Sequence, residues 1–266
     1  MPSPLVFFFA ILSIQNAAPI GEQTVANPEA AEFANAEVAN AQAVPYLSEW
    51  GFLPDSSNGP ASSADVFAAI KDYQSTYDLP VTGVMNSETK GLMSSPRCGI
   101  KDKGNREKRA LDLWWRKKNI RYHIASFPPG LSRDFVKSEM ERAFNGWKRF
   151  MSGRTFQQVG NSNDADIVLN FYTSGQHNKV CKSKWDSSSI LAHAFFPQVG
   201  QIHFNLDHSW TEPDKIGSVF FHEIGHALGL DHVNQNKLNL MYPYYVSGPK
   251  HFAGSSINAL KSTYSK

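Results

Sequence analysis

The chain has 266 residues, enough for one or two domains with full-sized hydrophobic cores. Its formal net charge of +2 is too small to indicate a nucleic-acid-binding protein, and its two cysteines are too few for a disulfide framework. These values exclude the strongly basic and the disulfide-rich classes and leave a globular protein, which we expect to be a monomer.

The N-terminus carries the only long apolar run of the sequence, residues 5–14. A run of roughly ten residues is too short to span a bilayer. Because the small residues Ala17 and Ala18 follow it, we predict a secretory signal peptide over residues 1–18. No later segment predicts a membrane span. We therefore expect a protein secreted to the extracellular space or the extracellular matrix.

The following segment predicts a small helical domain. Ser63 can cap a helix whose apolar residues recur with a period near 3.6, and Asn86 can cap a shorter helix. The residues from Tyr46 to Trp50 add a third helix. The apolar stripe of the longest helix consists of Val66, Ile70, Tyr73 and Tyr77.

Cys98 follows these helices in the sequence Pro-Arg-Cys-Gly over residues 96–99. Taken alone, this segment predicts a turn with an ordinary free thiol. A thiolate is also a soft and strong zinc ligand, so a zinc site elsewhere in the chain would give Cys98 a function.

Residues 106–109 read Arg-Glu-Lys-Arg. A basic run is most often a solvated loop, but Arg-x-Lys-Arg matches the recognition pattern of furin-like convertases. We therefore predict that such a convertase cleaves after Arg109. This cut would divide the chain after the leader into a propeptide, residues 19–109, and a mature protein, residues 110–266.

The mature part, residues 110–266, alternates strands with few helices. Ser132 can cap a long amphipathic helix, and alternating apolar residues predict four strands. This order predicts a sheet backed by two helices, with the active site beside an edge strand. The predicted strands lie at residues 120–124, 167–171, 191–195 and 202–204.

Residues 222–232 read His-Glu-Ile-Gly-His-Ala-Leu-Gly-Leu-Asp-His. Residues four apart lie on one face of a helix, so His222 and His226 can hold one zinc ion at roughly 2.0–2.1 Å. Gly229 ends the helix, because glycine enters the left-handed conformation at little cost. The turn then returns His232 as the third ligand.

Three neutral histidines leave zinc one open position for a water molecule, which ionises near neutral pH rather than at roughly 15.7. Glu223 is placed to take the proton of this water and to return it to a leaving amine. A buried amphipathic helix with core histidines would explain H-E-x-x-H alone. It does not explain Gly229 and His232 at these offsets, or Met241 in a later turn. We expect Asp214 to cap this helix.

These segments resemble the matrix metalloproteinases, a family of the metzincin clan. The resemblance covers nearly the whole chain after the leader and is strongest for the minimal, matrilysin-like members without a C-terminal hemopexin propeller. It implies an α+β fold in which a twisted mixed sheet with long helices, including the active-site helix, follows a small three-helix prodomain. It also implies that residues 110–266 are the catalytic domain of a zinc-dependent endopeptidase, made as a latent zymogen, that cleaves extracellular matrix proteins such as collagen or other extracellular proteins.

The resemblance assigns a function to the segment around Cys98. In the family this sulfur is a switch that occupies the open position on the zinc ion and keeps the zymogen silent. Arg97 and Asp102 would form the ion pair that anchors the loop.

The family binds its substrate as an added strand along the sheet edge, here at residues 190–192. Pro243 and Tyr245 would be walls of the main substrate pocket. Ser218 lies where the family often has a larger residue, so we expect a deep apolar pocket.

The family also holds a structural zinc with three histidines and an aspartate. His177, His193 and His203 match the histidines, whereas Lys179 takes the place of the aspartate. Cys181, two residues further on, is either the fourth zinc ligand or an unpaired buried thiol.

The calcium-binding segment of the family is poor in carboxylates here. Asp186 and Asp166, with Asp207, remain as candidate calcium ligands, and calcium needs six to eight oxygens.

A function of a different class is a binding module that kept the fold and the metal but lost turnover. Glu223 favours the enzyme, because a binding module needs no general base beside its metal.

Overall fold

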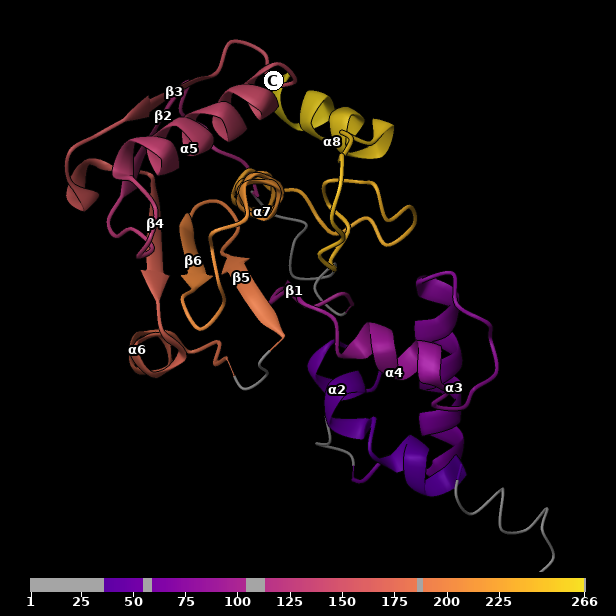
Figure 1. The fold of residues 1–266 in the computed structure, drawn as a ribbon. Helices are drawn as coiled ribbons and strands as arrows, with labels where there is room; N and C mark the ends of the chain where they lie inside the picture. The colour runs from indigo at the N-terminus through magenta and orange to yellow at the C-terminus, as the bar shows by residue number, and fades with distance from the viewer. Residues whose placement is uncertain (1–35, 55–58, 104–112, 186–188, 266) are drawn as a thin grey trace, which may run out of the picture.

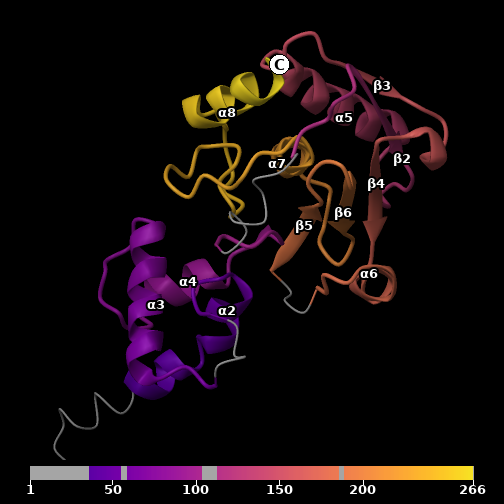
Figure 2. The same cartoon turned by 180° about the vertical axis from the view of Figure 1, so that it is seen from behind.

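The computed structural model describes residues 36–54, 59–103, 113–185 and 189–265. These residues build two hydrophobic cores, one in a helical lobe and one around a sheet. Figures 1 and 2 show the lobe of α2, α3 and α4 apart from the sheet, with β1 reaching from the lobe to the sheet edge. Among the described residues, no helix is long and apolar enough to cross a membrane.

The N-terminal lobe contains the three predicted helices, α2 (Val44–Glu49), α3 (Ser63–Thr76) and α4 (Ser87–Met93). Asn86 caps α4 as predicted, through a bond from the Thr89 amide to its side chain. The predicted cap of α3 is wrong by one residue. Ser62, not Ser63, accepts the amide of Asp65, and Asp65 accepts the amide of Ser62 in return, which completes a capping box.

The sheet has six strands in the order β1-β5-β6-β4-β2-β3. All neighbouring strands are parallel except β5 and β6, which are antiparallel. The sheet is therefore mixed, as predicted. The strands are β1 (Arg97–Cys98), β2 (Asn119–Ile124), β3 (Thr155–Gln158), β4 (Ile167–Tyr172), β5 (Ile190–Ala194) and β6 (Gln201–Asn205).

Two long helices, α5 (Arg133–Lys148) and α7 (Pro213–Ala227), cover one face of this sheet (Figure 1). The indole of Trp147 on α5 donates to the Phe221 carbonyl of α7 at 2.8 Å, and Phe144 stacks on Tyr122 of β2. These contacts hold α7 against the sheet. The remaining helices are α6 (Ser174–Val180), which follows β4, and α8 (Gly254–Tyr264) at the end of the described chain.

The helical lobe and the part of the chain that contains the sheet share one core at their boundary. Tyr242, Tyr244, Trp185 and Ile190 are buried together with the apolar residues of α2 and α3. The Tyr244 hydroxyl lies 2.6 Å from that of Tyr73 on α3. The lobe is therefore packed directly against the residues that follow Met241.

Candidate metal centres and substrate cleft

Helix α7 delivers the first two histidines of the predicted metal site. It begins at Pro213 with Glu212 at the cap position, so the prediction of Asp214 as the cap is wrong. Proline suits the first helical position because it has no amide hydrogen to leave unpaired, and Asp214 lies in the first turn. His222 and His226, one turn apart, are both buried.

Gly229 turns the chain back towards the site after α7 ends at Ala227. Its φ of +99° is a conformation that side chains rarely adopt, and a Cβ there would lie 2.2 Å from the Leu113 carbonyl oxygen. Only glycine fits this turn, which brings His232 to the other two histidines as predicted.

The three imidazoles are oriented through their Nδ1 atoms. Nδ1 of His222 lies 2.8 Å from the Leu240 carbonyl oxygen, and Nδ1 of His226 lies 2.7 Å from that of Leu230. Nδ1 of His232 lies 3.0 Å from Oδ1 of Asp102. With Nδ1 donating, the Nε2 atom of each ring carries a lone pair, which is the tautomer that a metal requires.

The first cluster, as we call Cys98, His222, His226 and His232, has its four ligand atoms within 4.8 Å of one another. The Nε2 atoms of His222 and His226 are 3.0 Å apart. Burial and then the neighbouring His232 lower the pKa of His222 to about 3, so its ring is neutral. Two lone pairs facing each other at this distance repel unless a cation lies between them. The donor set therefore fits zinc.

Glu223 lies beside this cluster with its carboxyl group enclosed. Its side chain is buried, and Oε2 accepts no hydrogen bond from any described residue. Burial raises the pKa of Glu223 to about 8, a shift that a hydrogen bond from Cys98 partly offsets. A carboxyl group with a pKa near neutrality is suited to both taking and returning a proton.

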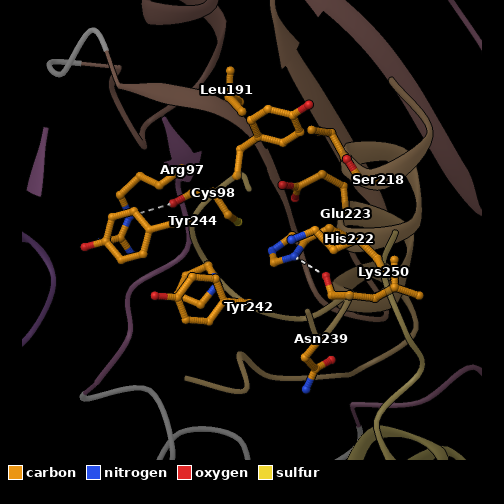
Figure 3. A pocket seen from close by; sticks show the side chains of 14 residues that line it. Arg97, Cys98, Leu191, Ser218, His222, Glu223, Asn239, Tyr242, Tyr244 and Lys250 are labelled. Carbon is orange, nitrogen blue, oxygen red and sulfur yellow. Dashed lines mark hydrogen bonds between the residues drawn. The ribbon is translucent and has the colours of Figure 1, made fainter. Parts of the chain in front are cut away.

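The segment that carries Cys98 lies in the cleft as an additional strand. On one side, the amides of Arg97 and Gly99 donate to the carbonyls of Ser189 and Ala192 next to and within β5, each at 2.8 Å. On the other side, the Cys98 amide donates to the Pro243 carbonyl at 2.8 Å. Figure 3 shows the Cys98 sulfur pointing towards Glu223 and His222. The predicted substrate edge is thus occupied by the chain's own segment.

Arg97 anchors this segment. Its guanidinium is fully buried and forms two bonds to Asp102, at 2.7 and 2.8 Å, which confirms the predicted ion pair. It also lies 3.5 Å above the ring of Trp50 in the helical lobe. Burial acts to raise the pKa of Asp102, but Arg97 and His232 outweigh it and lower that pKa. One carboxylate therefore connects the anchor to a metal ligand.

Met241, in the later turn that the sequence predicts, packs against the helix that carries His222 and His226. Its side chain is buried against Gly225 of α7. A Cβ at Gly225 would come within 2.5 Å of the Met241 sulfur and 3.2 Å of Trp147. The glycine between the two helix histidines is therefore required for the approach of the methionine turn.

The pocket beside Glu223 contains the three predicted wall residues, Ser218, Pro243 and Tyr245. Apolar and aromatic side chains, including Val219 and Leu240, form much of its lining. Sequence analysis missed Lys250, which also lines it (Figure 3). The pocket thus has largely apolar walls and two cations, Lys250 and the Arg97 of the segment that carries Cys98.

Lys250 is half-buried, and burial lowers its pKa from the ordinary value. Its ammonium donates to the Lys237 carbonyl oxygen at 2.7 Å rather than to a carboxylate. No motif marks this lysine, which is 28 residues from His222 and reaches the pocket only through the fold.

A second cluster lies on the sheet and consists of His177, Cys181, His193 and His203. Its four ligand atoms are within 4.8 Å of one another and all four residues are buried. His193 and His203 are direct partners in the antiparallel pair of β5 and β6, while α6 supplies His177. The three histidines matched by resemblance therefore meet, and Cys181 lies with them.

Comparison with known proteins gives the family. The matrixin family model matches residues 114–265, more than half of the chain. The chain belongs to the matrixin family. A second model, described as "Putative peptidoglycan binding domain", matches residues 35–93, which include the three helices of the N-terminal lobe.

Curated relatives of this matrixin extend over its N-terminal lobe as well. Matrix metalloproteinase-19 of Homo sapiens is 34% identical over 224 residues, 81% of this chain and 43% of the relative. The hatching enzyme of Paracentrotus lividus is 32% identical over 75% of this chain and 34% of its own length. Interstitial collagenase B of Mus musculus is 33% identical over 73% of this chain and 43% of the relative. The matrixin chain thus spans less than half the length of these relatives.

The predicted calcium ligands do not meet in the described part of the matrixin chain. Asp166 forms ion pairs with Lys117 and Arg121 and accepts the Arg121 amide at 2.9 Å. Asp207 accepts the amide of Ser174 at 3.1 Å. Asp186 lies outside the described residues, so a calcium site stays a prediction.

Two further predictions concern residues that the structure does not describe. The signal peptide, residues 1–18, and the convertase site at Arg109 lie outside the described ranges. Cleavage of this matrixin after Arg109 therefore stays a prediction as well.

Proposed function

We propose that this matrixin is the latent precursor of a secreted zinc endopeptidase that cleaves extracellular matrix proteins or other extracellular proteins. The observation that supports this function best is the first cluster, in which three oriented imidazoles and one removable thiol converge beside Glu223. Zinc bound there would make a water molecule acidic near neutral pH and polarise the peptide carbonyl. His222, His226 and His232 would hold it.

The protein's own groups carry the proton and position the substrate. Glu223 takes a proton from the attacking water and later gives it to the leaving amine, so one carboxyl group serves both steps. An extended substrate replaces residues 97–99 beside β5 and bonds to the carbonyls of Ser189 and Ala192. The residue after the scissile bond enters the pocket of Ser218, Pro243 and Tyr245.

Latency arises because Cys98 fills the position that water and substrate need. The sulfur supplies a fourth ligand, and the bonds of residues 97–99 fill the substrate edge at the same time. Removal of the propeptide by a furin-like convertase would open both.

Arg109→Ala should therefore leave the secreted protein at precursor length in cells that contain convertases. N-terminal sequencing of a normally processed Arg109→Ala protein would show that another protease makes the cut.

We also propose that the second cluster holds a structural zinc through His177, His193 and His203. Their facing nitrogens lie 3.0–3.2 Å apart. The cluster contains no carboxylate and, among the described residues, lies apart from Glu223. A metal there would brace α6 against β5 and β6 rather than act on substrate.

Incubation of the processed protein with a quenched peptide library tests the proposed activity. We expect hydrolysis that a zinc chelator abolishes and that added zinc restores. Glu223→Ala should bind zinc normally and remain inactive. If the wild-type protein binds zinc but hydrolyses no peptide, it is a binding module with the metzincin fold, and the proposed endopeptidase is wrong.

A further inference from the structure

The second cluster places a thiol where its family's pattern has none. Lys179, which takes the aspartate's place in the sequence, is exposed. Cys181 is buried immediately after α6, and its amide donates to the His177 carbonyl at 2.8 Å. That bond fixes the sulfur-bearing residue relative to the first histidine of the cluster.

The distances between the four ligand atoms fit one tetrahedral ion. Nε2 of His177, Nε2 of His193 and Nδ1 of His203 are separated by 3.0, 3.1 and 3.2 Å, and the Cys181 sulfur lies 3.8 Å from Nε2 of His193. Tetrahedral zinc, with bonds near 2.0–2.1 Å to nitrogen and 2.3 Å to sulfur, places nitrogens about 3.4 Å apart and nitrogen and sulfur about 3.6 Å apart.

Hydrogen bonding among the imidazoles does not account for this packing. A ring nitrogen either donates through its N–H or accepts through its lone pair, never both, so among three nitrogens in mutual contact at least one pair must place two donors or two acceptors against each other. A shared cation satisfies every nitrogen at once.

We propose that Cys181 is the fourth ligand of the second metal ion, which makes this site a Cys-His₃ zinc centre. The proposal rests on the structural zinc proposed above and assigns its missing ligand. The thiolate brings one negative charge to a cluster that otherwise has none, and sulfur selects zinc or another soft ion over calcium or magnesium. Trp185, stacked on His177 with ring centres 3.6 Å apart, shields the site from solvent.

The chain has only two cysteines, so each thiol can be tested alone. The test protein is the full-length precursor carrying Cys98→Ser and Glu223→Ala, in which Cys181 is the only thiol and self-cleavage is prevented. Cobalt replaces zinc, because thiolate-bound cobalt absorbs in the near ultraviolet whereas histidine-bound cobalt lacks that band. The precursor carrying Cys181→Ser and Glu223→Ala retains Cys98 and serves as the positive control for the band.

We expect two metal equivalents in the test protein and a thiolate-to-cobalt band. Adding Cys181→Ser should remove the band and lower the affinity for the second metal at least about 10- to 100-fold. Mutation of a residue that only hydrogen-bonds to a metal ligand already lowers metal affinity by that factor. The matched control Lys179→Ala alters an exposed residue of the same segment and should change neither measurement.

Other outcomes separate this proposal from those on which it rests. Two equivalents without a band in the test protein would overturn Cys181 as a ligand but keep the structural zinc. If the test protein binds one metal equivalent, and His226→Ala abolishes that binding, the second site is wrong and the first site is kept. The spectrum of the test protein decides by itself whether Cys181 binds the metal. The proposal can therefore be overturned even if the Cys181→Ser variant misfolds.

Discussion

The two clusters offer a metal the same four side chains, three histidines and one cysteine, yet their cysteines come from different places. Cys181 lies four residues after His177 and belongs to the same folded unit as its histidines. Cys98 comes from a separate segment that reaches the site from the helical lobe. The second set of side chains is closed within one folded unit, and the first is completed by a segment that the proposed cleavage would remove.

The residues that surround the two clusters also differ. The first cluster has Glu223 beside it and a substrate pocket, whereas the second is enclosed by Trp185 and the sheet. Zinc bound by four protein ligands is structural, and zinc with one open position is catalytic. If both proposals hold, the origin of the fourth ligand in the chain, rather than its chemistry, distinguishes a removable switch from a permanent structural site.

The largest effect should come from Glu223→Ala, which removes the group that only the first cluster possesses. We expect turnover to fall by about 10²–10⁴, because general-base help is lost, while zinc content stays normal. Measurements of kcat/KM and of metal content on the processed protein check this. Turnover close to that of the wild-type protein would exclude Glu223 as the base.

Exchanging each cysteine for serine tests the comparison directly. Cys98→Ser should make the uncleaved precursor active, with a rise of more than about 100-fold, because a hydroxyl is a far poorer zinc ligand than a thiolate. Cys181→Ser is the matched control and should leave the precursor latent. The measurement is peptide hydrolysis by precursors whose length is verified before and after the assay. A latent Cys98→Ser precursor would contradict the switch.

Arg97→Met should loosen the same switch without touching a ligand. The change leaves the buried Asp102 without its cationic partner, although Cys98 can still reach the metal. We expect precursor activity to rise by about 10-fold, equivalent to about 1.4 kcal/mol. Arg121→Met removes a half-exposed arginine that pairs with Asp166 and is the control. Equal activities of the two variants would show that the anchor does not maintain latency.

The smallest effect concerns the pocket, which the second cluster lacks. Lys250 is a half-buried cation in an otherwise largely apolar lining, so substrates with glutamate after the scissile bond should be accepted alongside leucine. Lys250→Met should lower kcat/KM for the glutamate peptide by about 10-fold and leave the leucine peptide nearly unchanged. A parallel loss on both peptides would mean that Lys250 supports the pocket wall only.

Local patterns in the sequence were sufficient to predict the three histidines of the first cluster, whereas the role of Cys98 came from the family resemblance. The spacing of His222 and His226 on one helix and the requirement for Gly229 at the turn are properties of neighbouring residues, so they can be read without the fold. The cap of α7 was mispredicted because Asp214 is a favourable cap type, whereas Pro213 already begins the helix.

The missed features depend on distant contacts. β1 has two residues and exists only because β5 and the residues after Met241 pair with it. α6 has a mostly polar sequence without an apolar stripe, so no periodicity marks it. The position of the Cys181 sulfur and the approach of Lys250 to the pocket likewise required the tertiary structure.

The two-residue strand β1 has a consequence for the protein after activation. In the precursor it covers β5, whose outer backbone groups are then satisfied by Arg97 and Gly99. Loss of the propeptide turns β5 into an edge strand, and an uncovered edge is a template for any extended chain, including another copy of the enzyme. We therefore expect the activated protein to be less soluble than the precursor when no substrate is present. The precursor would then be the form better suited to storage.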